Sequence, residues 1–286
     1  MSSESNVINS ADDSRRPAAH PFLDRLGKVL DGPLAGLIPW IILGVFEGPG
    51  RIGWAALAAL VLSVFFVGAD VVRGRSMKLL GVIDVVFFLA LLIISHVISQ
   101  GGLDWLETWM GEISNVTLTI IALGSILARF PFTIQYAREE VPKEFWHNPV
   151  FVRINYVITG FWGLAFLVSS IVGFYGDFVL EDNNNLWTGW IVQVGAMLVA
   201  VQFTAWYPPY ARAKAAHKAG WADVEPAPPV SELFTPLTVW FVPIGIITLV
   251  TEAGPVWLGI AFIVIGVGLG AVLRRDLEAE SRNGAG

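Results

Sequence analysis

Eight apolar segments, separated by short polar connections, decide what this chain can fold into. An α-helix needs about 20 residues to cross the hydrocarbon core of a bilayer, and most of the segments come close to that length. The chain is 55% hydrophobic and only 15% charged, which is too little charge for the surface of a soluble protein of 286 residues. We therefore predict an all-α, polytopic transmembrane helix bundle of about eight spans. The segments are 34–46, 54–72, 79–99, 113–130, 156–174, 186–206, 237–250 and 256–272.

Two of these segments, 34–46 and 237–250, are short for a span. Each would form a helix about 20 Å long at 1.5 Å per residue, and each contains a proline, Pro39 or Pro243. Such a segment can re-enter the membrane, or it can be a tilted span that flanking residues extend. A longer apolar segment follows each of them, and this pairing favours spanning.

Both ends of the chain are polar. Residues 1–20 contain no apolar stretch of a signal peptide, and we expect a disordered cytoplasmic tail there. Residues 21–31 predict an amphipathic helix in the membrane interface. The transmembrane domain then covers 21–275, and 276–286 form a short cytoplasmic tail. The apolar face of the interfacial helix would consist of Phe22, Leu26, Val29 and Leu30.

The positions of the charged residues predict the orientation. With the N-terminus inside, 17 of the 18 Lys and Arg residues lie in internal loops or tails, and only Arg51 lies outside. The positive-inside rule then places both termini in the cytoplasm, and an even number of spans agrees with this. The segments group as four hairpins whose turns face outward. We expect the protein in the inner (plasma) membrane.

The cytoplasmic loop 131–153 joins the two halves of the chain and is unusually rich in charged and aromatic side chains. Because proline lacks an N–H, Pro131 should end the fourth span near Arg129, and Pro142 should make a second break. Between the two prolines we predict a short helix along the inner membrane surface. Its apolar side, against lipid or the bundle, carries Phe132 and Tyr136.

The polar side of this short helix carries Gln135, Arg138 and Glu139. Two interpretations are open for them. They are free to bind a protein partner, or they lock the loop to Arg153 or Lys143 and so staple neighbouring spans together.

Asp84 is the most unusual ionisable residue, because it lies within a span. It comes six residues after Lys78, which is about 9 Å further along a helix. A carboxylate at this depth is costly and usually faces a partner or water. It is either a proton or cation site, or one half of a structural ion pair with an arginine of the inner boundary. The candidate arginines are Arg75, Arg129 and Arg153.

Three further polar residues, Asn155, Gln193 and Gln202, lie in spans or at their ends. They can hydrogen-bond one helix to another or line a cavity. Small residues at Gly266 and Gly270 argue for close helix packing, either within one chain or in a homo-oligomer.

Several classes of site are missing from the sequence. It has no cysteine, hence no disulfide or thiolate, and no His pair has metal-ligand spacing. A nucleophile elbow, a phosphate-binding loop and a dinucleotide-binding turn are also absent. We therefore expect no catalytic residues, no cofactor and no metal. The basic residues flank the spans in small groups, which suits anionic membrane lipids rather than nucleic acid.

Two runs of residues carry a family resemblance. The first is Arg73-Gly-Arg75-Ser76 before a span, followed by Asn115, Ser125, Arg129 and Pro131 at the next one. Through it, residues 34–175 resemble the intracellular septation protein A-like group of bacterial inner-membrane proteins. The second, Phe132 to Glu139, resembles a run in uncharacterised bacterial multi-pass inner-membrane proteins. This chain has more spans than the septation proteins. The resemblance implies a bacterial inner-membrane protein of envelope maintenance or division.

These patterns lead to two functional hypotheses. The first is a non-enzymatic organiser of partners or lipids at the cytoplasmic face. The alternative is a small-solute or ion transporter or channel, with Asp84 as its coupling carboxylate. A transporter needs polar groups around one cavity near the midplane. The two hypotheses are therefore separated by whether Asp84, Asn155, Gln193 and Gln202 surround a common cavity.

Overall fold

The computed structural model describes residues 33–181, 185–221, 225–251 and 253–283, and in this part of the chain every regular element is helical. The predicted tail 1–20 and the predicted interfacial helix 21–31 lie outside the described residues. The elements are α3 (Pro33–Phe46), α4 (Ile52–Val72), α5 (Leu79–Val97), α6 (Gln100–Leu127), α7 (Phe132–Glu140), the 3-10 turn η2 (Lys143–Phe145), α8 (Pro149–Phe174), the π-helical turns η3 (Tyr175–Val179) and η4 (Trp187–Ile191), α9 (Val192–Lys218), α10 (Val230–Val250) and α11 (Val256–Asn283).

Six of the described helices are long and apolar enough to cross a membrane, namely α4, α5, α6, α8 with η3, η4 with α9, and α10. Two shorter apolar helices, Ala35–Phe46 and Val256–Val272, complete the eight apolar segments of the sequence. The segment 237–250 is longer than predicted, because α10 starts at Val230 and continues through Pro236. With 21 residues, α10 has the length of a full span, whereas α3 keeps its 14 residues.

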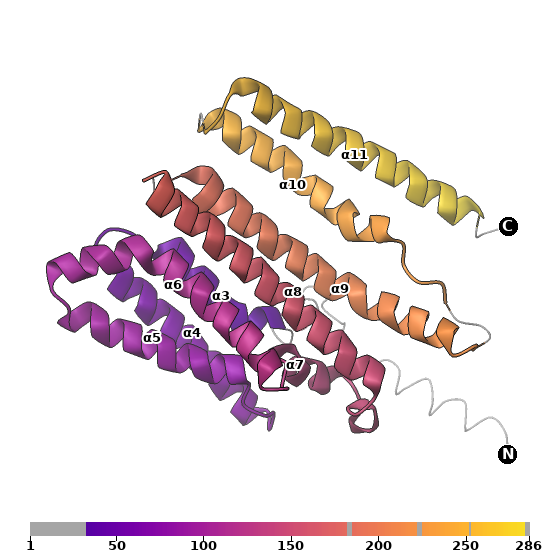
Figure 1. The fold of residues 1–286 in the computed structure, drawn as a ribbon, viewed down its shortest axis with the longest axis horizontal. Coiled ribbons are helices and arrows are strands. Elements are labelled where there is room, and N and C mark those ends of the chain that lie inside the picture. Colours follow the sequence, from indigo (N-terminus) through magenta and orange to yellow (C-terminus); the bar gives the residue numbers. More distant parts are fainter. Residues whose placement is uncertain (1–32, 182–184, 222–224, 252, 284–286) are drawn as a thin grey trace, which may run out of the picture.

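The helices lie roughly side by side, with α8 at the centre (Figure 1). Helices α3, α4 and α5 pack together as one group, and α8 packs against α6 on one side and α9 on the other. Residues 98–99 join α5 to α6 in a tight turn, as the hairpin pattern predicts, but α6 packs mainly against α8 and not against α5. Phe161 of α8 and Phe203 of α9 stack with ring centroids 4.1 Å apart.

The last two helices form a hairpin that packs more closely on itself than on α9. A Cβ added to Gly245 of α10 would lie 2.6 Å from the carbonyl oxygen of Gly259 in α11, so the two backbones touch. Gly266 meets the Phe241 Cβ in the same way, at 2.9 Å. Of the two glycines predicted to pack closely, Gly266 therefore does so within one chain, whereas a Cβ on Gly270 would meet only the Thr238 hydroxyl, at 3.9 Å.

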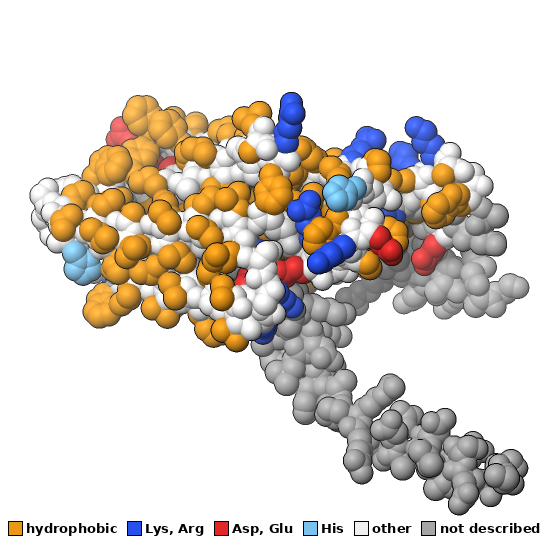
Figure 2. Space-filling view, turned by 90° about the horizontal axis from the view of Figure 1, so that it is seen from below, with side chains coloured by type: hydrophobic (Ala, Val, Ile, Leu, Met, Phe, Trp, Pro, Cys, Tyr) orange, Lys and Arg blue, Asp and Glu red, His pale blue; other side chains and the backbone are white. Residues whose placement is uncertain are grey.

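Large apolar side chains are buried inside the bundle and also cover its outside. Phe88, Met110 and Trp162 are almost completely buried. Many others are exposed, among them Phe65 at 63% and Ile120 at 65%. Figure 2 shows this apolar cover over much of one face. A soluble protein rarely exposes so much apolar surface, whereas a bilayer solvates it.

The basic side chains gather at one end of the bundle, to the right in Figure 2. We call this the α7 end, because α7 lies there together with the α4–α5 connection (Figure 1). The described chain begins at this end with α3 and finishes there with the last turns of α11. An even number of crossings is the simplest path that returns the chain to the same end.

Candidate functional site at the α7 end of the bundle

The prolines on either side of helix α7 determine where it begins and ends. Helix α6 ends at Leu127, Arg129 takes a left-handed conformation with φ 60°, and Pro131 precedes the first residue of α7. The Ser125 hydroxyl accepts a hydrogen bond from the Phe132 N–H at 3.1 Å, which satisfies one of the free donors at the start of a helix. The prediction of a short helix between Pro131 and Pro142 is confirmed.

The apolar side of α7 packs against the bundle rather than against lipid. Phe132 and Tyr136 are 2% and 4% exposed. Thr133 connects α7 to α8, because its hydroxyl lies 2.8 Å from the Thr159 hydroxyl and donates to the Asn155 carbonyl at 3.1 Å. The Asn155 side chain donates back to its own helix, to the Phe151 carbonyl at 2.9 Å. Asn155 thus helps to hold α7 on α8.

The polar side of α7 is also bonded within the protein. The Gln135 Oε1 accepts a hydrogen bond of 2.6 Å from the backbone N–H of Leu79, the first residue of α5. The first N–H groups of a helix have no partner within the helix, so Gln135 acts as a cap supplied by another helix.

Glu139 belongs to an ion cluster centred on Lys78. The Lys78 ammonium donates to both oxygens of Asp70, at 3.0 and 2.9 Å, and lies 3.3 Å from Glu139. Arg75 lies 3.6 Å from Glu139 on the other side. The Lys78 side chain is only 6% exposed. The partners expected from the sequence, Arg153 and Lys143, were wrong for Glu139, because its side chain reaches Lys78 beside the start of α5.

Arg138 stacks on aromatic rings. Its guanidinium lies 5.0 Å from the ring of Trp146 and 5.6 Å from that of Phe130. Gln135, Arg138 and Glu139 therefore all hold α7 in place, which favours the staple over a free docking site. Arg129 is exposed in the short connection between α6 and α7.

Tyr136 connects the ion cluster to α3. The Lys78 ammonium lies 5.0 Å from its ring centroid, and its hydroxyl touches the place where a Cβ of Gly36 would be. Burial raises the pKa of the Tyr136 hydroxyl well above its usual range. Tyr136 is therefore a neutral hydrogen-bonding group at physiological pH.

Asp84 is 1% exposed and accepts a hydrogen bond of 2.8 Å from the indole N–H of Trp40 in α3. The donor that the structure provides is thus an indole and not an arginine of the inner boundary, which was one of the two alternatives. Asp84 also lines a small cavity of about 90 Å³ between α3, α4, α5 and α7.

The other predicted polar residues lie elsewhere. Gln193 is bonded near the opposite end, where it accepts from Asn115 at 3.0 Å and donates to the Thr188 carbonyl at 3.0 Å. Gln202 is half-buried on α9 and lines neither the small cavity nor the large groove described next. Asp84, Asn155, Gln193 and Gln202 therefore do not surround a common cavity.

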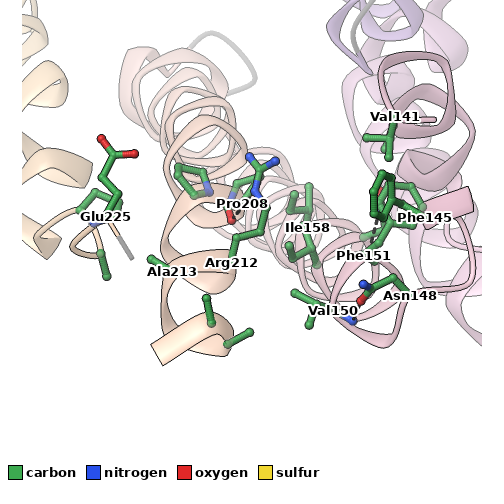
Figure 3. A pocket seen from close by; sticks show the side chains of 18 of the residues that line it. Val141, Phe145, Asn148, Val150, Phe151, Ile158, Pro208, Arg212, Ala213 and Glu225 are labelled. Carbon is green, nitrogen blue, oxygen red and sulfur yellow. Dashed lines mark hydrogen bonds between the residues drawn. The ribbon is translucent and has the colours of Figure 1, made fainter. Parts of the chain in front are cut away.

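A large groove lies at the α7 end, with a volume of about 1730 Å³. We call it the α8–α9 groove. In Figure 3, Phe151 and Ile158 of α8 lie between Phe145, which follows α7, and Arg212 of α9. Glu225 lies on the far side of α9, ahead of α10. No sequence pattern predicted this groove, because helices from distant parts of the chain form its walls.

The walls of the α8–α9 groove are mostly apolar, with four charged side chains among them. Three of the four are carboxylates, so the groove has a formal charge of −2. Among the described residues, no three His, Asp or Glu side chains come together as metal ligands. The charged side chains of the groove are Glu140, Arg212, Glu225 and Glu232.

No protein family, no curated protein and no solved structure matches this chain.

Proposed function

We propose that this protein is a bacterial inner-membrane protein that binds a cytoplasmic partner in the α8–α9 groove and organises it in envelope maintenance or division. The observation that carries the proposal is the groove itself. Its volume of about 1730 Å³ exceeds the roughly 300–1,000 Å³ of a small-molecule pocket, and it is open to the surface. A groove of this size suits a helix or peptide from another protein.

The chemistry of the groove describes the partner. Apolar walls such as Phe151 and Ile158 suit the apolar face of an amphipathic helix. The surplus of carboxylates favours a partner with basic residues beside that face, since complementary charge selects and orients partners. The positive-inside rule supports the cytoplasmic side, because the basic residues gather at the α7 end.

The transporter hypothesis has less support. It requires polar groups that converge on one site near the midplane. Asp84, Asn155, Gln193 and Gln202 belong to separate places in the bundle. The absence of a shared cavity among them removes the argument that would favour transport over binding.

The test places a photo-crosslinking amino acid at Phe145, which is 47% exposed on the groove wall. In living cells we expect a discrete adduct with one cytoplasmic protein. Ala213→Trp should abolish this adduct, because the new ring fills part of the groove. A growth or division phenotype should then appear. The matched control is His217→Trp, on the same helix but not lining the groove.

Two results would contradict the proposal. In one, Ala213→Trp reaches the membrane at normal levels and leaves both the adduct and cell growth unchanged. In the other, His217→Trp removes the adduct as completely as Ala213→Trp does. Either result would mean that the groove is not where the partner binds.

A further inference from the structure

The carboxyl group of Asp84 lies in an apolar setting. Its hydrogen-bond donor, Trp40, is 5% exposed and packs against Phe87 and Phe88, with ring centroids 4.6 and 5.0 Å away. Leu80 and Phe88, one turn to either side on α5, are buried as well. A carboxylate without a counter-ion in such surroundings is costly, and it usually takes up a proton or a cation instead.

The small cavity links Asp84 to the α7 end. Its volume of about 90 Å³ is enough for about three water molecules at about 30 Å³ each. Ser63 and Asp70 of α4 line it, as do Lys78 at the start of α5 and Tyr136 of α7. All of these side chains carry polar atoms that water can bond. Waters in this cavity would connect the Asp84 carboxyl with the ion cluster around Lys78.

The charged groups around the cavity are engaged with one another. Lys78 is held by two hydrogen bonds to Asp70 and by Glu139 at 3.3 Å. Arg73 of α4 also lines the cavity and has contacts of its own. Helix α3 contributes Trp40, which does not titrate. The charged partners of Lys78 are thus at the mouth of the cavity, and Asp84 lies at its inner end.

The row of polar side chains that lines the cavity ends at Asp84. Phe88 and Leu91 are the next side chains on the same face of α5, and both are buried and apolar. No polar side chain follows on α5 before Ser95, eleven residues further on, or about 17 Å along the helix. The Ser95 and His96 side chains both bond to the Leu92 carbonyl of their own helix. A proton that reaches Asp84 from the α7 end has no polar route onward along α5.

We infer that Asp84 is a proton-binding site that exchanges protons with the α7 side of the membrane only, through the water-sized cavity beside Tyr136. The ligand is a proton, held on the Asp84 carboxyl while the indole N–H of Trp40 donates to it. This is a one-sided binding site and not a pathway across the membrane. The site differs from the groove proposed above as the partner's site, although Tyr136 lines both hollows.

The first experiment measures protonation by infrared difference spectroscopy of the whole protein in lipid. We expect one component of the protonated-carboxyl C=O stretch at neutral pH to be lost in Asp84→Asn. The same component should be retained in Glu47→Gln and in Glu112→Gln, which change two other carboxyls of the chain. The band should shrink as the pH rises. Asn keeps the size and the acceptor oxygen of Asp84. An unchanged spectrum in Asp84→Asn would overturn the inference.

If Asp84→Asn does not fold, Trp40→Phe gives the same information. It removes the hydrogen bond that Trp40 of α3 donates to the carboxyl, so the Asp84 band should shift in frequency. A band that does not move would show that it comes from another carboxyl, and the inference would fail.

The second experiment measures from which side the cavity is reached. The chain has no cysteine, so Ser63→Cys introduces a single thiol into the cavity wall. Vesicles are prepared with either the α7 end or the opposite end of the protein facing outward. A small, charged thiol reagent added outside should modify the thiol faster when the α7 end faces outward. The control is Ser169→Cys in α8, which is buried at 4% but lines neither hollow. Equal rates from both sides, or a rate no faster than that of the control, would refute one-sided access.

Discussion

The ion cluster around Lys78 makes a quantitative prediction about stability. Lys78→Met keeps the length of the side chain but removes its charge, which leaves Asp70 and Glu139 facing each other at a site where their side chains are only 15% and 14% exposed. Removing one partner from a buried ion pair costs about 3–5 kcal/mol, because the remaining charge stays buried without compensation. We expect the free energy of unfolding to fall by about this amount.

The partners of Lys78 should differ in their coupling to it. Asp70 makes two hydrogen bonds to the ammonium, whereas Glu139 lies at 3.3 Å and both of its oxygens are buried without a hydrogen bond. A double-mutant cycle with Asp70→Asn should therefore give a larger coupling energy than one with Glu139→Gln. The triple neutral variant should recover most of the loss, because replacing a whole buried ion cluster is often close to neutral.

Unfolding in mixed detergent micelles, followed through the fluorescence of the 12 tryptophans, measures these energies. The control is Lys214→Met on α9, an exposed lysine whose described contacts are with Tyr210 alone. A surface change of this kind should stay within about 0.5 kcal/mol of the wild type. If Lys78→Met is as stable as Lys214→Met, the ion cluster does not staple α7 to α4 and α5, and the reasoning is wrong.

Three further predictions concern other parts of the molecule. Gly245→Ala should lower stability by about 1–3 kcal/mol, because the new Cβ meets a backbone carbonyl, whereas Gly268→Ala has open space and should cost nothing. Thermal unfolding measures both variants, and equal stabilities would contradict the prediction. Burial raises the pKa of Glu47 from 4.5 to about 7, so the folded state binds more protons than the unfolded state, and stability should fall as the pH rises from about 4.5 to 7. Glu47→Gln should flatten this pH dependence of stability. An equally steep profile in Glu47→Gln would rule Glu47 out as its source. In intact cells, an impermeant maleimide should label Gly101→Cys but not His217→Cys, and the reverse pattern would overturn the orientation.

What the sequence predicted correctly rests on local physics. Pro131 and Pro142 act on their own backbone, so the end of α6 and both ends of α7 could be placed from the sequence. The apolar segment 237–250 began too late, because α10 starts at Val230 and runs through Pro236. A proline within a helix removes one hydrogen bond, and neighbouring helices can hold the helix together across it.

The partners of side chains could not be predicted in this way, because they depend on which helices pack together. Glu139 of α7 forms an ion pair with Lys78, which precedes α5, and Asp84 of α5 accepts a hydrogen bond from Trp40 of α3. One signal was available for the second pair: a buried tryptophan needs an acceptor for its N–H, and Asp84 was the only carboxylate deep in a neighbouring segment. The α8–α9 groove has no comparable signal, since α7, α8, α9 and the start of α10 all contribute to it.

The contact between Gly245 and Gly259 has a consequence for how the protein is made. Helices α10 and α11 leave the ribosome after the other described helices, and their closest contacts are with each other. We expect the two to enter the bilayer as a finished pair, without an earlier helix as a template. Because Glu232 at the start of α10 lines the α8–α9 groove, that groove gains its last wall only when this pair has joined the rest. A nascent chain that stops before residue 230 would reach the membrane with the groove still incomplete.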